Sequence, residues 1–262
     1  MPFFVYSLED VVSTGAAELL KGLADFREEK PINGLRCFGY RNMKLVEIPG
    51  IHVNADFLDE LGADYIIFLS RHSSAKGVIS FTVHPEGNWD RSAEIGGKPK
   101  QLATAAPVEM LKVLKKMSEL NKTEHAVTYE ATHHGPFLKT PSLYAELGGS
   151  EATWYNTALL QILAKSVLES VDADVPYDKI AIGIGGLHYE DRFARLALSG
   201  KYAFSHMMAR HSVAELDMLD QAINRSNRKA EIAVIEWKSI TAEERNKAVE
   251  KLNELGLDYV KI

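Results

Sequence analysis

The sequence predicts an α/β fold in which a mixed central sheet is flanked by helices. Short apolar runs alternate with amphipathic stretches along the 262 residues, as when strands are connected by helices. Residues 64–70 are almost uniformly apolar, which is typical of a strand buried on both faces. The next apolar run, residues 77–83, follows too soon for a crossover helix to fit between them.

The N-terminal half divides into elements by apolar spacing and by breaker residues. We expect a strand at 3–6, then an amphipathic helix at 16–29, because Leu19, Leu20, Leu23 and Phe26 have helical spacing. The further elements expected here are an extended segment at 36–48 bent at Gly39, the strands at 64–70 and 77–83, a helix at 107–120 that begins with Pro, and a strand at 125–132. Residues 84–103, rich in Gly, Pro and polar side chains, are expected to form a long loop or small insertion.

The C-terminal half begins with a helix expected at 151–168, with Ser150 as its N-cap and Glu151 at the positive end of its dipole. The elements expected after it are strands at 179–184, 202–205 and 231–237, and helices at 191–198, 213–224 and 241–255. In the last helix, Thr241 and Glu244 have the spacing of a capping box. No internal repeat or Pro-rich linker divides the chain, so a single α/β domain over residues 1–262 is expected.

Composition indicates a cytoplasmic protein. The chain is 46% hydrophobic and 25% charged, and it has no apolar run of the roughly 20 residues that a membrane span needs. The first ten residues lack the basic segment of a signal peptide, and the lone Cys37, expected as a small buried hydrophobe, suits a reducing compartment. Without a heptad pattern we expect a monomer.

The net charge and the local grouping of cations indicate how the protein could bind nucleic acid. The net charge of −6 argues against a protein that coats nucleic acid indiscriminately, and no DNA partner is expected. Two local groups of cations could still hold a few phosphates. They are Lys112, Lys115 and Lys116 along one side of the expected 107–120 helix, and Arg225, Arg228 and Lys229 further on.

The segment EATHHGP, residues 130–136, is the most informative motif. Imidazole is the commonest protein ligand of zinc, and His133 and His134 follow an expected strand. Adjacent side chains in a strand point to opposite faces, so both histidines can face one ion only if the strand ends before them. His72, His84 and His188 also follow apolar runs, and ligands of open α/β sheets bind outside the carboxyl ends of strands.

Other motifs mainly exclude common enzyme classes. The turn GIGGLHY lacks the spacing of a dinucleotide fingerprint and the Lys-Ser/Thr of a P-loop. Its Gly185 and Gly186 are expected to let backbone amides and His188 approach a substrate closely. The sequence has no H-E-x-x-H helix of a metallopeptidase and no G-x-S-x-G nucleophile elbow.

Five ordered blocks carry a family resemblance over essentially the whole chain. SRHSSAKG, TVHPEGNW, EATHHGP, AELGGSEATW and GIGGLHY resemble the archaeal and plant type of D-aminoacyl-tRNA deacylase. The resemblance implies a zinc-dependent hydrolase that cleaves the ester between a D-amino acid and tRNA. It also implies an α/β core similar to peptidyl-tRNA hydrolase and nucleoside-phosphorylase-like folds.

The residues suit a reaction that activates water with Zn²⁺. We expect His72, His133, His134 and His188 to hold the metal. Glu130 is expected to be a further ligand or to orient a histidine. Glu146 is the candidate general base, with an ordinary surface acid as its alternative. The amides of the helix that follows Ser150 could bind an oxyanion or a phosphate.

Two other functions fit the same residues. A zinc-dependent amidase or peptidase acting on small substrates could use the same ligands. A non-catalytic RNA-binding protein could use the histidines to contact phosphate.

Overall fold

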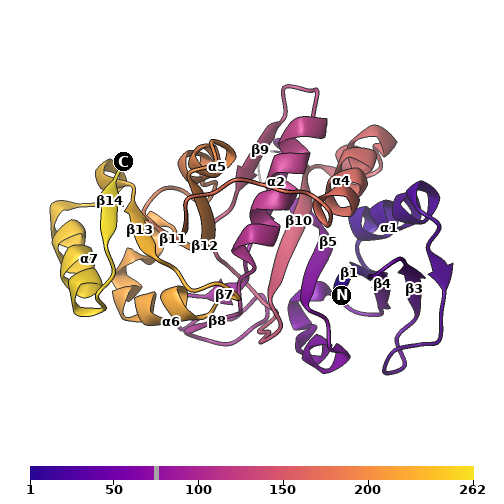
Figure 1. Ribbon diagram of the computed structural model, residues 1–262, viewed down its shortest axis with the longest axis horizontal. Helices are drawn as coiled ribbons and strands as arrows, with labels where there is room; N and C mark the ends of the chain where they lie inside the picture. The colour runs from indigo at the N-terminus through magenta and orange to yellow at the C-terminus, as the bar shows by residue number, and fades with distance from the viewer. Residues whose placement is uncertain (74–76) are drawn as a thin grey trace.

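The computed structural model describes residues 1–73 and 77–262, so the middle of the SRHSSAKG block lies outside the described residues. A mixed eight-stranded sheet forms the N-terminal side of the elongated molecule, and a parallel four-stranded sheet forms the C-terminal side (Figure 1). This confirms an α/β fold with a central mixed sheet flanked by helices. Within the described ranges no helix is long and apolar enough to cross a bilayer.

The eight-stranded sheet has the order β2-β3-β4-β1-β5-β10-β6-β9. Its strands are β1 (Pro2–Ser7), β2 (Arg27–Glu28), β3 (Cys37–Tyr40), β4 (Met43–Ile48), β5 (Tyr65–Ser73), β6 (Ser80–His84), β9 (Ala126–Tyr129) and β10 (Ser142–Gly149). Strands β4, β1, β5 and β10 are mutually parallel, whereas β6 is antiparallel to β10 and parallel to β9.

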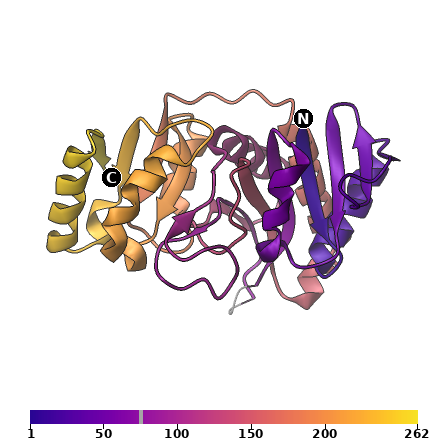
Figure 2. The same cartoon turned by 90° about the horizontal axis from the view of Figure 1, so that it is seen from below.

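The second sheet has the order β12-β11-β13-β14 and is parallel throughout. Its strands are β11 (Lys179–Ile184), β12 (Tyr202–Met208), β13 (Ile232–Ile235) and β14 (Tyr259–Lys261). Residues 171–178 connect it to the first half of the chain, crossing in front of the helices in Figure 1 and over the top of the molecule in Figure 2. The segment expected as a loop or insertion contains the small antiparallel pair β7 (Gly87–Asn88) and β8 (Gln101–Leu102).

The helices are α1 (Val11–Leu23), α2 (Pro107–Leu120), α3 (Glu151–Trp154), α4 (Thr157–Ser170), α5 (Asp191–Leu198), α6 (Leu219–Asn224) and α7 (Ala242–Glu254). Short 3₁₀ helices lie at His52–Asn54, Asp56–Leu61, Arg210–Met218 and Trp237–Ser239. Helices α2, α5 and α7, strand β11 and the Thr241/Glu244 capping box confirm the sequence expectations.

Strand β10 separates the two faces of the large sheet. Successive strand side chains point to opposite faces, and Leu143, Ala145 and Leu147 join the core that also contains the apolar sides of α1, α2 and α4. Tyr144 belongs to a second core on the other face, with Phe68 of β5 and the 3₁₀ segments. Glu146 therefore points away from the helices that Figure 1 shows in front.

Three expected helices differ from the structure. The stretch expected as one helix at 213–224 is instead the 3₁₀ helix Arg210–Met218 followed by the short α6. The helix expected at 16–29 begins instead at Val11, because the Asp10 side chain accepts hydrogen bonds from the amides of Val12 and Ser13. It ends at Leu23, and Arg27–Glu28 pair with β3 as a strand. The helix expected at 151–168 is broken at Tyr155, and Asn156 caps a new helix, α4.

The strand pattern also differs from expectation at three places. The segment 36–48 is a hairpin that reverses at Arg41, whose φ is 53°, and does not simply bend at Gly39. The sequence analysis missed β10 and β14. In β10, a carboxylate and two glycines interrupt the apolar run, and this concealed a central, fully buried strand.

Candidate metal centre

The site lies on the face of the large sheet opposite α2 and α4. Strands β5 and β6 run in opposite directions, so their carboxyl ends lie at opposite ends of the sheet. His72 and His84 therefore could not meet in a crevice beyond the carboxyl ends of the strands. They meet instead over β10, where His72 pairs in register with Gly148 and His84 with Tyr144, on either side of Glu146. The expectation of a strand-end crevice is thus wrong in geometry, although the same residues assemble.

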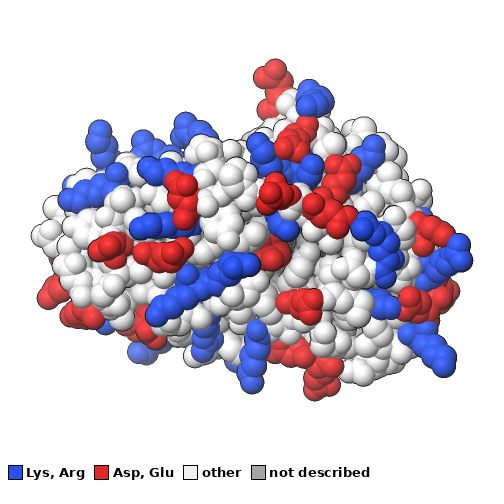
Figure 3. Space-filling view, viewed as in Figure 1, with Lys and Arg blue, Asp and Glu red and all other residues white. Residues whose placement is uncertain are grey.

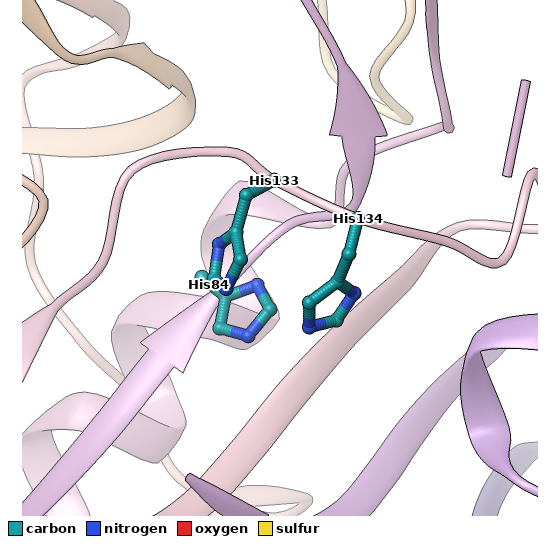
Figure 4. Close-up of side chains that lie close together, drawn as sticks. All are labelled: His84, His133 and His134. Atoms are coloured by element: carbon teal, nitrogen blue, oxygen red, sulfur yellow. The ribbon is translucent and has the colours of Figure 1, made fainter. Parts of the chain in front are cut away.

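Three imidazoles form the densest part of the site. His84 ends β6, and its ring centroid lies 4.2 Å from that of His133 and 5.0 Å from that of His134. The His133 and His134 centroids are 4.3 Å apart. Figure 4 shows the three rings gathered together, one from the end of the strand and two from the loop. One nitrogen from each ring lies within 4.8 Å of the others, which is close enough to share an ion.

The end of β9 explains how adjacent histidines face one point. The strand stops at Tyr129, and His134 has a φ of 44°, in the left-handed region. The backbone there is no longer extended, so the alternation of side chains between faces does not apply. The sequence analysis required the strand to end before His133 and His134 if both were to face one ion, and the structure meets this requirement.

Backbone carbonyls fix the orientation of all three rings. The Nδ1 atoms of His84, His133 and His134 lie 3.1, 2.8 and 2.7 Å from the carbonyl oxygens of Pro85, Ala131 and Gly135. Carbonyls only accept, so each Nδ1 carries the proton and donates it. In the neutral form of each ring, Nε2 then presents a lone pair, which is the arrangement that prepares an imidazole to bind a metal.

Burial keeps two of these imidazoles neutral. It holds the pKa of His133 well below its usual value and lowers the pKa of His134 to about 3. For His84, burial also favours the neutral form, but the nearby Glu146 carboxylate outweighs it and raises the pKa to about 9. Its Nε2 is buried and has no hydrogen-bond partner in the described residues. A metal cation would satisfy this atom where a proton otherwise would.

Glu130 connects the three imidazoles to a second group of donors. It is fully buried, and its Oε1 lies 3.2 Å from His72 Nδ1 while its Oε2 lies 3.1 Å from His188 Nε2. The same Oε2 is 3.6 Å from His133 Nε2. His72, Glu130 and His188 form a second set of potential ligands, and the Tyr189 hydroxyl lies 2.8 Å from His72 Nε2.

Glu146 lies between the two groups. Its Oε2 is 3.6 Å from His72 Nδ1 and 3.5 Å from His84 Nε2. Burial acts to raise its pKa, but the two imidazoles outweigh burial and hold the pKa well below the usual range. The surface-acid alternative is wrong, because Glu146 is only 3% exposed and lies inside β10.

The structure therefore brings together six residues expected from the sequence, namely His72, His133, His134, His188, Glu130 and Glu146. Their roles as ligands and base stay predictions. The sequence analysis did not include His84 among the ligands. The signal was present, since His84 also ends an apolar run. The missed strand β10 concealed that His84 pairs with Tyr144, two residues before Glu146, and that its Nε2 lies 3.5 Å from the Glu146 carboxylate.

Three other residues expected to contact a substrate, Gly185, Gly186 and Ser150, are not among the potential metal ligands. Gly185 and Gly186 both have φ of 93°, and a Cβ on them would meet Ser239 and Glu190, so they shape the turn that carries His188. Ser150 stands at the N-cap of α3 without a capping bond from its side chain, and α3 is only four residues long. Contact between these residues and a substrate stays a prediction.

The α2 lysines lie on the opposite side of the sheet from the histidines. Lys116 is 3.1 Å from Glu119 and 3.9 Å from Glu169, and Lys115 is 3.9 Å from Glu119. Figure 3, which views this side, shows basic and acidic side chains interspersed. No ion pair of Lys112, Arg228 or Lys229 occurs in the described ranges, and the phosphate contacts expected of these cations remain untested. Arg225, by contrast, lies over the ring of Phe137, three residues beyond His134.

An α/β sheet that carries buried carboxylates and buried or half-buried histidines on one face defines a candidate metal-dependent enzyme. Residues 59–260 match the family described as D-aminoacyl-tRNA deacylase, and the chain belongs to this family. D-aminoacyl-tRNA deacylase of Pyrococcus furiosus is 39% identical over 215 residues, 79% of each chain. Its counterpart in Ignicoccus hospitalis is 35% identical and covers 98% of this chain and 97% of its own.

Comparison with solved structures extends over the whole chain. A crystal structure of a conserved protein of unknown function matches with a TM-score of 0.91 and 28% identity. The match covers 100% of this chain and 95% of the other. The arrangement of both sheets is therefore shared with a relative determined by crystallography.

Proposed function

We propose that the chain hydrolyses the ester of D-aminoacyl-tRNA, with Zn²⁺ as its cofactor. Family membership supports the reaction. The observation that supports the metal is the set of three imidazoles whose Nδ1 atoms donate to carbonyls and which each offer a nitrogen within 4.8 Å of the others. A His₃ set with an open position is a common catalytic zinc arrangement.

Two groups of donor atoms are potential ion sites, and a third group, His84, Glu130 and Glu146, shares one residue with each of them. His84, His133 and His134 would hold one ion, and His72, Glu130 and His188 offer a second set. Zn²⁺ in such a site lowers the pKa of bound water to about 7 and polarises a carbonyl oxygen. The ester of aminoacyl-tRNA is an activated bond, so no protein nucleophile is needed.

The carboxylates have separate tasks in this proposal. Glu130 contacts His72, His133 and His188 and holds them in position. Glu146 touches both groups of ligands through His72 and His84, and it is the residue best placed to hold a proton between them. Burial excludes water behind these groups and strengthens every charge interaction among them.

The test uses the full chain with matched D- and L-aminoacyl-tRNA, in chelator and again after Zn²⁺ is restored. We expect release of the D-amino acid only, lost on chelation and recovered with Zn²⁺, and metal analysis should show zinc in the purified protein. His84→Ala should lower the zinc content, whereas Ser150→Ala, outside the cluster, should keep it.

Other outcomes would favour the alternatives. Cleavage of small amides with none of charged tRNA would identify an amidase or peptidase. Binding of tRNA without any ester cleavage at any zinc concentration would identify an RNA-binding protein. Full activity in a metal-free protein would contradict the zinc proposal but leave the deacylase reaction standing.

A further inference from the structure

Two cations and an aromatic ring form a surface cluster close to the histidine loop. Lys98 Nζ lies 4.4 Å from the centroid of the Phe137 ring, and Arg225 Cζ lies 5.2 Å from the same centroid. Lys98 is exposed, whereas Phe137 and Arg225 are half-buried. We call these three residues the Lys98–Phe137–Arg225 cluster. On the same loop, Ile95 leaves 61% of its surface exposed.

The backbone fixes this cluster beside the metal centre. The amide of Gly135, the residue after His134, donates to the carbonyl of Ile95 at 2.9 Å. A Cβ on Gly97 would lie 3.1 Å from the Cα of Gly135, so the two segments touch where only glycine fits. The loop that carries Lys98 is thereby packed directly against the loop that carries His134.

Hydrogen bonds also hold Phe137 and Arg225, the other two members of the cluster, in place. The amide of Phe137 donates to Asp56 Oδ1 at 2.8 Å, and Arg225 Nη1 donates to the carbonyl of Leu102 at 2.7 Å. Three segments distant in sequence thus present two cations and a ring in a fixed arrangement. Such preorganisation lowers the entropy lost when a ligand binds.

The two cations lack acidic partners, although the protein as a whole is acidic. Neither Lys98 nor Arg225 forms an ion pair with any described residue, whereas Lys100, two residues from Lys98, lies 2.8 Å from Glu215 and 2.7 Å from Asp217. Two neighbouring like charges repel each other, and this repulsion is relieved by an anion between or beside them. The cluster therefore has the electrostatic character of an anion site.

We propose that the Lys98–Phe137–Arg225 cluster binds the single-stranded 3′ end of tRNA. This rests on the proposed function, which requires the ester-bearing terminal nucleotide to lie at the metal centre. Lys98 and Arg225 contact backbone phosphates of the preceding nucleotides, and Phe137 with Ile95 supplies apolar surface for a base. Cations combined with an aromatic side chain are the usual means of binding single-stranded RNA.

The experiment measures binding of a short single-stranded RNA that ends in CCA with a free 3′ hydroxyl, so it does not depend on hydrolysis. Lys98→Gln, Arg225→Gln and Phe137→Leu are compared with the unchanged protein across a salt series. The control is Lys247→Gln, which removes the same charge from a distant exposed ion pair with Glu243. Lys98→Gln is the decisive variant, because its exposed side chain makes no described contact that folding requires.

We expect each charge variant to weaken binding several-fold and to reduce the slope of log K against log[salt] by about 0.7, the contribution of one phosphate on a single strand. Phe137→Leu should weaken binding at least about 5-fold with an unchanged slope. With D-aminoacyl-tRNA as substrate, Lys98→Gln should raise KM and leave kcat near its original value. Lys247→Gln should alter none of these.

Two results would overturn the proposal. One is an unchanged affinity and salt slope in both charge variants, and the other is an equal loss in Lys247→Gln. Failure of the proposed function has a different signature. The unchanged protein would then cleave no D-aminoacyl-tRNA, while the cluster variants would still lose RNA affinity.

Discussion

At the level of single residues, Glu146 is a carboxylate that interacts with imidazoles from both groups of potential ligands. Its carboxylate contacts an imidazole from each potential ion site, and its pKa is held well below the usual range by those imidazoles. A carboxylate with so low a pKa is a weak base when free of metal, and it is a strong partner for a positively charged neighbour. The same position suits the orientation of His72 and His84, and it would suit proton transfer once a bound metal had displaced the imidazole protons that lower this pKa.

We expect Glu146→Gln to lower turnover of D-aminoacyl-tRNA by roughly 100-fold or more, because the amide cannot accept a proton at neutral pH. Single-turnover kinetics would measure this, together with zinc content and tRNA affinity, which should both persist. Turnover close to that of the unchanged enzyme would show that Glu146 does not transfer the proton. A parallel loss of zinc would show that it mainly positions the ligands.

At the level of elements, the break between α3 and α4 replaces one long expected helix. Asn156 Oδ1 accepts hydrogen bonds from the amides of Ala158 at 3.0 Å and Leu159 at 3.3 Å, which caps α4. Helix α4 packs on α1 and α2 and contributes Leu159, Leu160 and Leu163 to the core. The cap therefore supports the helical layer behind the metal centre.

Asn156→Ala should destabilise the fold by about 1 kcal/mol, the usual cost of losing an N-cap side chain. The matched control is Ser150→Ala, because Ser150 is also exposed at an N-cap but makes no capping bond. Urea unfolding should separate the two variants. Equal stability of both would contradict the assignment of the cap to Asn156.

At the scale of the whole molecule, His206 joins the second sheet to the segment that leads to the metal centre. It lies in β12, and its Nε2 donates to the carbonyls of Arg225 at 2.9 Å and Ala103 at 3.2 Å. Its Nδ1 accepts from the hydroxyl of Thr132, the residue before His133. The neutral ring thus forms hydrogen bonds with three separate segments of the chain. Burial lowers its pKa to about 4.

This contact makes stability depend on pH. Between the unfolded value of about 6.5 and the folded value of about 4, the unfolded chain binds more protons, so stability falls as pH falls through this window. The full contribution of a group so deeply buried is on the order of 3 kcal/mol. Urea unfolding from pH 7 to pH 4 should show a shallower decline for His206→Gln than for the unchanged protein. Identical declines would mean that His206 does not control this loss.

The sequence by itself determined the α/β class, most helices and the residue types of the site. These depend on local quantities, namely apolar periodicity, capping residues such as Thr241, and imidazoles that follow apolar runs. His72, His133, His134 and His188 could be selected in this way, and Glu130 and Glu146 followed from their places in two of the blocks that resemble the family. The condition that the strand must end before His133 was also set correctly from strand geometry.

Only the tertiary structure decided how these residues meet. Strand β10 has a buried carboxylate that no local pattern favours, and it becomes a strand because its neighbours supply hydrogen bonds and imidazoles to pair with Glu146. Its insertion between the parallel β5 and the antiparallel β6 brings the side chain of His84 beside Glu146 and places the site on the face of the sheet instead of at the strand ends. Strand direction and pairing are long-range properties, so a single sequence does not reveal them.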